Sequence, residues 1–243
     1  MNIVLTMAGK YSRFKLFANQ VPKYLLPLGK NTILWHVINE LRCAAPELKF
    51  YLVANKEDRD FFPILESTIN DFSIDTENLI YIGDTESQLK TALTIGENPL
   101  VKKIELMSPI VFANIDTIVK GRGNFFKQMQ SLNPDEMVID LFPGYSNEYS
   151  YATTDDNNKI ENLSDGIRIS HQACSGLYGF GSAAFFVKEA DALIAGNPKV
   201  NFTKLYQRLI DMKYASYACF NDDIGNTVVL GTPEEYTVNL HRF

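Results

Sequence analysis

Short apolar segments alternate with amphipathic helical segments along most of the chain, and this alternation constrains the fold more than any other feature. Asn2–Met7 reads NIVLTM, an apolar and β-branched run that ends at Ala8-Gly9, as buried strands of parallel sheets do. The segment 33–41 follows, with apolar residues at 3.6-residue spacing behind a potential Asn31-Thr32 helix cap. Strand, loop and helix therefore form the first unit of a predicted α/β fold.

The same alternation continues to residue 142. Further strands are predicted at Phe50–Ala54, Leu79–Ile82, Pro109–Ala113 and Met137–Phe142, and helices at Asp58–Ile69, Gln88–Ile95 and Asn124–Leu132. We expect Pro63 to break the first of these helices. A βαβ order of this kind predicts a mostly parallel sheet with helices on both faces.

The second half of the chain has a different pattern. The strand-like segments Tyr149–Thr154 and Lys159–Leu163 flank a turn-forming cluster at 155–158, which predicts a hairpin. A further strand is predicted at Cys174–Phe180, and helices at Ala183–Ile194, Phe202–Met212 and Glu234–Leu240. Because no repeat or linker interrupts the 243 residues, we expect a single domain over 1–243.

Charge is distributed unevenly along the chain. With 23 basic and 29 acidic residues the net charge is −6, which argues against a nucleic-acid-binding protein. Residues 1–39 nevertheless carry +5 and no acid, which leaves −11 on the remainder. A local cationic patch suits a small, highly charged anion such as a nucleotide, although a solvated surface gives the same pattern. Its basic residues are Lys10, Arg13, Lys15, Lys23 and Lys30.

Localisation signals are absent from the sequence. No apolar run reaches the length of about 18 residues that a membrane span needs, and the apolar start lacks the basic residues of a signal peptide. We therefore expect a cytoplasmic protein with no membrane partner. Cys43, Cys174 and Cys219 are odd in number and far apart, so we expect neither a disulfide framework nor a zinc knuckle, but buried, reduced thiols.

The candidate chemistry lies in Met7–Lys30, which reads MAGKYSRF, seven further residues and PKYLLPLGK. A loop at the carboxyl end of the first strand is where open α/β sheets bind ligands, and Ala8-Gly9 lets backbone N–H groups approach a phosphate. Arg13 and Lys23 could reach the same anion. The P-loop pattern and the Rossmann G-x-G-x-x-G are both absent. A surface loop with scattered cations remains the alternative.

The segment MAGKYSRF, followed by VPKYLLPLGKNTILWHVINEL, resembles the signature of the sugar nucleotidyltransferases, or nucleoside-diphosphate-sugar pyrophosphorylases. Four later segments are similar to elements of that family, in the same order. They are GDTESQLKTAL at 83–93 for base recognition, FANIDTIV at 112–119 for the metal-binding Asp, SGLYGF at 175–180 for the acceptor strand, and GTPEEY at 231–236. The resemblance implies a nucleotide-diphospho-sugar transferase-like α/β fold with an inserted β region that binds the acceptor.

The resemblance also implies an activity. A nucleoside monophosphate would pass from a nucleoside triphosphate to a phosphorylated acceptor, most often a sugar 1-phosphate, with Mg²⁺ as cofactor and pyrophosphate as product. Nucleotide sugars of this kind serve polysaccharide biosynthesis. By the family's pattern, Arg13 holds the triphosphate, Lys23 bridges the two reacting phosphates and Asp116 binds Mg²⁺. The implied binding residues are Ala8, Gly9 and Gln88 for the nucleotide and Gly176 for the acceptor.

Three of these residues also have ordinary structural interpretations. Without the resemblance, Asp116 reads as a helix cap, Gln88 as an exposed helix residue and Gly176 as a β-bulge.

The chain departs from the family pattern at three places. Tyr11 stands where relatives often have glycine, and we expect its ring to turn outward so that only backbone groups face the phosphates. The Glu-Lys pair before the acceptor strand is missing, and Arg168 is a candidate replacement. Val229 stands where relatives often have a second metal-binding Asp, which leaves Asp222 or Asp223 as possible ligands.

Other functions remain open at this point. The acceptor of a cytidylyltransferase could be a non-sugar phosphate, or the chain could be a catalytically silent protein that senses a nucleotide. Asn114-Ile115-Asp116 imitates the D-x-D motif of glycosyltransferases, although Pro22-Lys23 argues against that class. The base, the acceptor and the oligomeric state cannot be predicted from the sequence.

Overall fold

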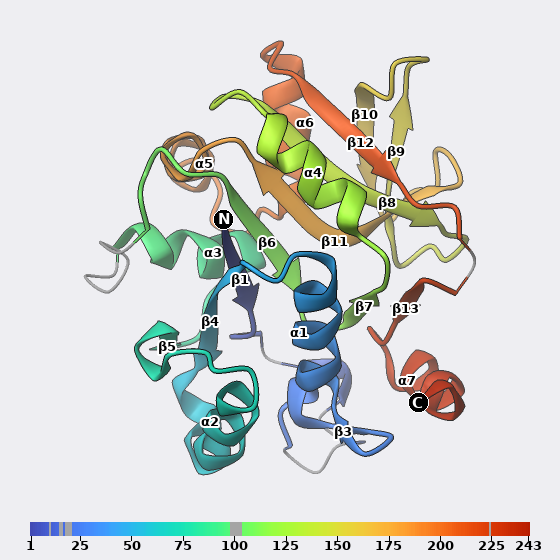
Figure 1. Cartoon of the computed structure of the whole chain (residues 1–243). Coiled ribbons are helices and arrows are strands. Elements are labelled where there is room, and N and C mark those ends of the chain that lie inside the picture. The colour runs from blue at the N-terminus through green and yellow to red at the C-terminus, as the bar shows by residue number, and fades with distance from the viewer. Residues whose placement is uncertain (10, 15–16, 18–20, 98–103, 224) are drawn as a thin grey trace.

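The computed structural model describes residues 1–9, 11–14, 17, 21–97, 104–223 and 225–243, and a nine-stranded sheet forms its centre (Figure 1). The strands of this sheet are β1 (Asn2–Thr6), β4 (Lys49–Asn55), β5 (Leu79–Ile82), β6 (Ile110–Asn114), β8 (Met137–Pro143), β9 (Ser150–Thr154), β10 (Ile160–Asp165), β11 (Gln172–Phe180) and β12 (Ser216–Phe220). Two short ribbons lie outside it, β2 (Pro27–Leu28) with β3 (Asn31–Thr32), and β7 (Thr117–Val119) with β13 (Thr227–Val229).

The order of the main sheet is β10-β9-β11-β6-β1-β4-β5, with β8 paired to β11 and β12 paired to β8. Strands β6, β1, β4 and β5 run parallel, as the βαβ pattern predicts. Strand β11 joins them antiparallel and carries β8 and the predicted hairpin β9–β10. The α/β fold and its inserted β region are therefore confirmed. One sheet joins both halves, and the single domain over 1–243 stays a prediction.

Helices cover both faces of the sheet because its strands are apolar on both faces. Ile3 and Leu5 of β1 belong to one core, whereas Val4 belongs to the other. The first core is covered by α1 (Ile33–Ala44), α2 (Phe62–Asn70), α4 (Gly123–Ser131) and α7 (Pro233–Asn239), and the second by α3 (Gln88–Glu97), α5 (Ala183–Ile194) and α6 (Phe202–Asp211).

Several predictions of local structure need correction. Pro63 does not break its helix: it occupies the first turn of α2, where a missing N–H costs nothing, and a 3₁₀ segment, Lys56–Phe61, precedes it. Strands β7, β12 and β13 were not predicted: β7 and β13 have only three residues each, too few for an apolar pattern to show, and the five residues of β12 were missed. The expectation that all three cysteines are buried is wrong: Cys43 is exposed and Cys174 and Cys219 are half-buried, although all three are free thiols.

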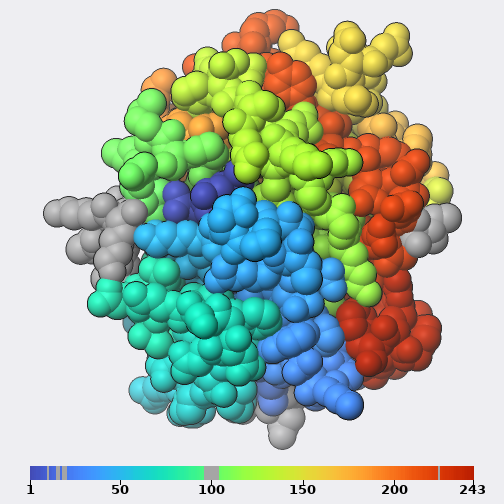
Figure 2. Space-filling view, in the orientation of Figure 1, coloured from blue at the N-terminus to red at the C-terminus, as the bar shows by residue number. Residues whose placement is uncertain are grey.

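The C-terminal residues pack against the N-terminal segment. The Tyr236 hydroxyl of α7 donates to the carbonyl of Pro27, and the Phe243 ring lies 4.7 Å from the His36 ring of α1. Figure 2 shows the red C-terminal residues against the blue N-terminal ones on this face. This contact brings the residues before α7 beside the loop that follows β1. Among the described helices, none combines the length and apolar character needed to cross a bilayer.

Candidate active site

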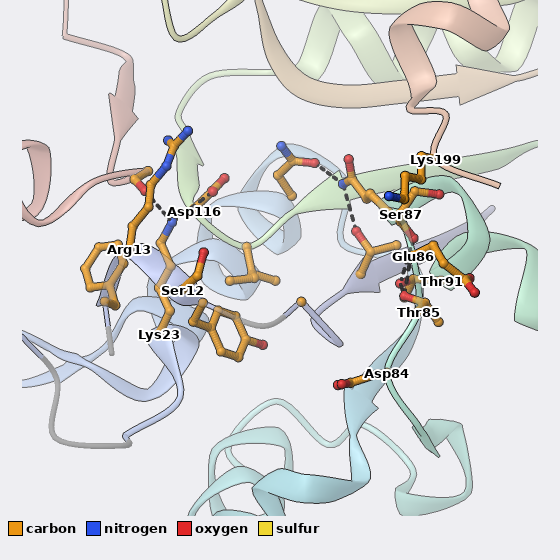
Figure 3. Close-up of a pocket in the computed structure, with 18 residues that line it drawn as sticks. Ser12, Arg13, Lys23, Asp84, Thr85, Glu86, Ser87, Thr91, Asp116 and Lys199 are labelled. Carbon is orange, nitrogen blue, oxygen red and sulfur yellow. Dashed lines mark hydrogen bonds and ion pairs between the residues drawn. The ribbon is translucent and has the colours of Figure 1, made fainter. Parts of the chain in front are cut away.

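A cavity of 730 Å³ lies beyond the carboxyl ends of β1 and β6. The loop after β1 contributes Gly9, Arg13 and Lys23 to its lining, and later segments contribute Gln88 and Asp116. Figure 3 shows Arg13, Lys23 and Asp116 together on one side of this cavity, and Thr85, Ser87 and Lys199 on the other. Parallel sheets bind ligands at this edge, and because the resemblance in sequence implies a nucleotide here, we call it the nucleotide cavity.

Lys23 is a buried cation in the wall of the nucleotide cavity. Its Nζ donates to Asp116 Oδ2 at 2.9 Å and to the carbonyl of Gly231 at 3.1 Å, and it lies 4.8 Å from the centre of the Phe14 ring. The Lys23 side chain is 6% exposed, whereas that of Asp116 is 32% exposed. A buried ammonium needs such partners, and they hold it in a fixed position.

Arg13 is held much more loosely. Its Nη2 lies 2.8 Å from Glu148 Oε2, and the two side chains are 59% and 53% exposed. Ion pairs this exposed contribute little to stability, so Arg13 can exchange Glu148 for a phosphate at small cost. The structure thus brings both predicted catalytic cations to one cavity.

Gln88, the first residue of α3, ties two strand ends together. Its Nε2 donates to Thr6 Oγ1 at 2.9 Å and to Asn114 Oδ1. Because both amide hydrogens are used in these contacts, only the side-chain carbonyl of Gln88 remains to accept a hydrogen bond from a base. Gln88 lines the nucleotide cavity, and its role in reading the base stays a prediction.

Gly9 and Ala8 occupy different positions. Gly9 is exposed and lines the cavity, and a Cβ built on it would meet no atom within 4 Å, so this stretch of backbone is open to a ligand. Ala8 is 1% exposed and is not among the described residues that line the cavity. A direct nucleotide contact therefore suits Gly9 better than Ala8.

The expectation that the Tyr11 ring turns outward is wrong. The ring packs edge-on against Tyr24, with ring centres 5.9 Å apart, and its hydroxyl donates to the carbonyl of Met7. Burial raises the pKa of Tyr11 well above its usual range, so the hydroxyl stays protonated. Tyr11 has a φ of +45°, the left-handed conformation that a glycine adopts freely. The chain thus keeps a glycine-like backbone, and the Tyr11 ring supports the loop through Tyr24 while the residue also lines the nucleotide cavity.

A second cavity of 170 Å³, which we call the acceptor cavity, adjoins the first and shares Arg13, Asn114, Asp116 and Gly231 with it. Gly176 lines it, at a bulge in β11 where φ is +90°. A Cβ on Gly176 would lie 2.6 Å from Asn114 Cγ, so the close approach that requires glycine here is that of Asn114. Arg168 lies over the Tyr145 ring and is not among the described lining residues of either cavity.

The residues around Asp116 fit a magnesium ion that is shared with a substrate. Within the described residues, no three His, Cys, Asp or Glu side chains gather closely enough to enclose a metal. Mg²⁺ commonly takes one or two protein carboxylates and completes its shell with phosphates and water, which the open side of Asp116 permits. Asp222 and Asp223 come before Thr227, the residue of β13 that pairs with Val119 of β7. Asp116 lies at the opposite end of this two-stranded ribbon, so these two candidate ligands are at the other end of the ribbon from Asp116.

Several lining residues of the two cavities were not predicted from the sequence. Glu148 and Tyr149 lie on the loop after β8, and Lys199 lies between α5 and α6, without a recognisable motif. Glu235 belongs to the segment GTPEEY, in which its position is that of a capping-box residue. The structure shows that Glu235 does form the capping box of α7, in addition to lining the acceptor cavity.

Three solved structures with the same fold carry the names of nucleotidyltransferases. A nucleoside-diphosphate-sugar pyrophosphorylase from Vibrio cholerae RC9 matches with a TM-score of 0.79 and 22% identity, over 98% of this chain and 99% of that chain. A Bacillus anthracis protein described as a glucose-1-phosphate thymidylyltransferase matches with a TM-score of 0.78 and 14% identity, over 99% and 94%. The inositol-1-phosphate CTP transferase from T. maritima matches with a TM-score of 0.75 and 12% identity, over 99% and 94%.

No protein-family model matches the chain, and no curated protein matches it in sequence. The shared fold over nearly the whole chain is what these comparisons establish.

Proposed function

We propose that this chain, which has the fold of the sugar nucleotidyltransferases, transfers a nucleoside monophosphate from a nucleoside triphosphate to a phosphorylated small molecule and releases pyrophosphate. The observation that carries the proposal is the convergence of Arg13, Lys23 and Asp116 on one cavity at the carboxyl end of β1. Two cations and one carboxylate suit a reaction between two phosphate groups. Such a reaction needs charge neutralisation and alignment rather than a covalent nucleophile.

In the proposed reaction, a phosphate oxygen of the acceptor attacks the α-phosphorus of the nucleoside triphosphate. The bond from that phosphorus to the oxygen bridging toward the β-phosphate breaks, and pyrophosphate leaves with the electron pair. Lys23, fixed in the wall of the nucleotide cavity by Asp116 and Gly231, which line both cavities, neutralises charge where the two phosphates meet. Arg13 exchanges Glu148 for the triphosphate, and Gly9 presents its backbone N–H.

Asp116 would hold Mg²⁺ in this reaction. The ion, when bound, supplies further positive charge for the triphosphate and the leaving pyrophosphate. The Lys23 ammonium donates a hydrogen bond to the Asp116 carboxylate in the structure. It therefore already lies beside the proposed Mg²⁺ site, where positive charge is needed.

A sugar 1-phosphate is the leading acceptor class, as the names of two structural neighbours suggest, and the inositol-1-phosphate CTP transferase suggests a non-sugar acceptor as well. We place the activity in the cytoplasm, where nucleoside triphosphates are available.

Pyrophosphate release tests the proposal directly. The purified chain would be assayed with Mg²⁺ and each of CTP, UTP, dTTP, GTP and ATP against phosphorylated sugars, alcohols and amines. Release that requires both a nucleotide and an acceptor supports a transferase. Saturable nucleotide binding with no release from any pair would instead identify a nucleotide-sensing protein.

A further inference from the structure

The acceptor cavity has an acidic lining. The carboxylates of Asp116, Glu148 and Glu235 border it, whereas Arg13 is the one cation among its described lining residues. An acceptor whose phosphate approaches Lys23 and Asp116 would place the rest of its structure in this cavity. The charges there therefore bear on the chemical class of the acceptor.

Glu235 is fixed in place by two donors that carry no positive charge. Its Oε1 accepts from the Tyr149 hydroxyl at 2.8 Å, and its Oε2 accepts from the backbone N–H of Thr232 at 3.0 Å. Burial raises the pKa of Tyr149, and the bond to Glu235 raises it further, so the phenol keeps its proton and acts as the donor. Glu235 thus presents a carboxylate to the cavity without a cationic partner in either of these contacts.

Arg13 is the cationic partner of Glu148 only while no triphosphate is bound. In the proposed function Arg13 turns to the triphosphate and Asp116 holds Mg²⁺, which leaves Glu148 and Glu235 facing the acceptor. A ligand that displaces water from two carboxylates is favoured when it brings a compensating positive charge.

One more feature of the cavity suits a cationic group. Tyr149, whose hydroxyl holds Glu235, lines the cavity, and aromatic rings attract ammonium groups. Tyr178 and Ser175 also line it, but the Tyr178 ring stacks on Phe202 with ring centres 4.6 Å apart, and the Ser175 hydroxyl is buried beside Asp140. Recognition of a cationic group therefore depends on neither of these two side chains.

We infer that the acceptor is a phosphate ester with a positively charged nitrogen, an amino or ammonium group held between Glu148 and Glu235 and bordered by Tyr149. This inference rests on the proposed function and narrows its acceptor class. The bonds formed and broken are those already given, because the cationic group takes no part in the transfer.

Two pairs of near-isosteric acceptors test the inference. Glucosamine 1-phosphate is compared with glucose 1-phosphate, and phosphoethanolamine with 2-hydroxyethyl phosphate, so that within each pair an amino group replaces a hydroxyl. We expect the amine of at least one pair to have a kcat/KM higher by about tenfold or more, or about 1.4 kcal/mol, in pyrophosphate release at neutral pH.

Glu235→Gln removes the charge and keeps the shape. A glutamine at this position of a capping box still accepts the backbone bond through its carbonyl oxygen, and its amide NH2 can then donate to the Tyr149 hydroxyl oxygen. We expect the amine preference to fall toward parity through a higher KM for the amine, with little change for the hydroxyl partner. Glu234→Gln is the matched control, because Glu234 is exposed on the same helical turn and does not line the cavity.

The possible failures are distinguishable. Equal or better use of the hydroxyl partners by the wild type would overturn the inference and leave the proposed function intact. Retention of the amine preference in the Glu148→Gln variant and in the Glu235→Gln variant would also overturn the inference and leave the proposed function intact. No pyrophosphate from any pair of nucleotide and acceptor would refute the proposed function, and the inference with it.

Discussion

Lys23 Nζ lies 2.9 Å from Asp116 Oδ2, although the two residues are 93 positions apart in the chain. The fold thus places a buried ammonium against the one carboxylate that the family resemblance assigns to Mg²⁺. Each group neutralises the other in the absence of substrate. In the proposed reaction both serve the same phosphates, Lys23 directly and Asp116 through the ion, so this pair is the centre of the site.

Lys23→Ala should lower kcat/KM by about 100-fold or more, the scale of losing one preorganised charge stabiliser. The expected cause is the loss of the fixed ammonium between the two phosphates. Steady-state pyrophosphate release measures it. Lys30→Ala is the control, because Lys30 is exposed and borders a separate hollow on the surface. Near-normal turnover by a folded Lys23→Ala variant would remove Lys23 from the mechanism.

Asp116→Asn should raise the Mg²⁺ concentration needed for half-maximal activity, because an amide oxygen is a weaker ligand than a carboxylate for this hard ion. A Mg²⁺ titration of activity at saturating substrates measures the change. Asp222→Asn should leave the titration unchanged, since Asp222 precedes the far end of β13. If the two variants exchange these results, the metal ligand lies at Asp222 and our assignment is wrong.

Tyr11→Phe should reduce the stability of the protein more than its affinity for nucleotide. The variant loses the hydrogen bond from the Tyr11 hydroxyl to the Met7 carbonyl, which typically contributes about 0.5 to 1.5 kcal/mol. The ring contact with Tyr24 is kept. Chemical denaturation measures the first effect, and calorimetric titration of nucleotide measures the second. A loss of affinity beyond about tenfold, or about 1.4 kcal/mol, would show that the hydroxyl binds the ligand instead.

Asp58 should make the protein less stable as pH rises. Burial raises the pKa of Asp58 from 3.8 to about 6, even though its carboxylate accepts a hydrogen bond from the Tyr24 hydroxyl. The folded state therefore binds this proton more tightly than the unfolded state, and the resulting stability is lost between about pH 4 and pH 6. Asp58→Asn does not ionise, so its free energy of unfolding relative to wild type should rise across this interval. A constant difference would contradict the assignment.

The order and type of the main elements were predictable because their signals are local. Leu79–Ile82 was predicted as a strand and is β5 with the same bounds, and Ala183–Ile194 is α5 in the same way. Apolar periodicity within one segment is enough to specify such elements. The β7 and β13 strands have three residues each, and their pairing depends on a partner far away in the chain.

The site was only partly predictable for a similar reason. Arg13, Lys23 and Asp116 lie in motifs, and the structure brings them together. The bond between Tyr149 and Glu235 spans 86 positions and has no local signal, so the acidic lining of the acceptor cavity was not foreseen. For Tyr11 the residue type suggested an outward ring, but its left-handed backbone turns the ring toward Tyr24. Long-range packing, rather than residue type, decides these details.

The fate of a labelled phosphate tests the central claim most directly. The chain is incubated with Mg²⁺, an accepted phosphate ester and nucleoside triphosphate labelled either at the α-phosphate or at the γ-phosphate, and the products are separated. A nucleotidyltransferase places the α-label in a nucleotide-linked acceptor and the γ-label in pyrophosphate, in equal amounts, and Lys23→Ala slows the formation of both by about 100-fold or more. Transfer of the γ-label to the acceptor, or its release as inorganic phosphate without a nucleotide-linked product, would contradict the account.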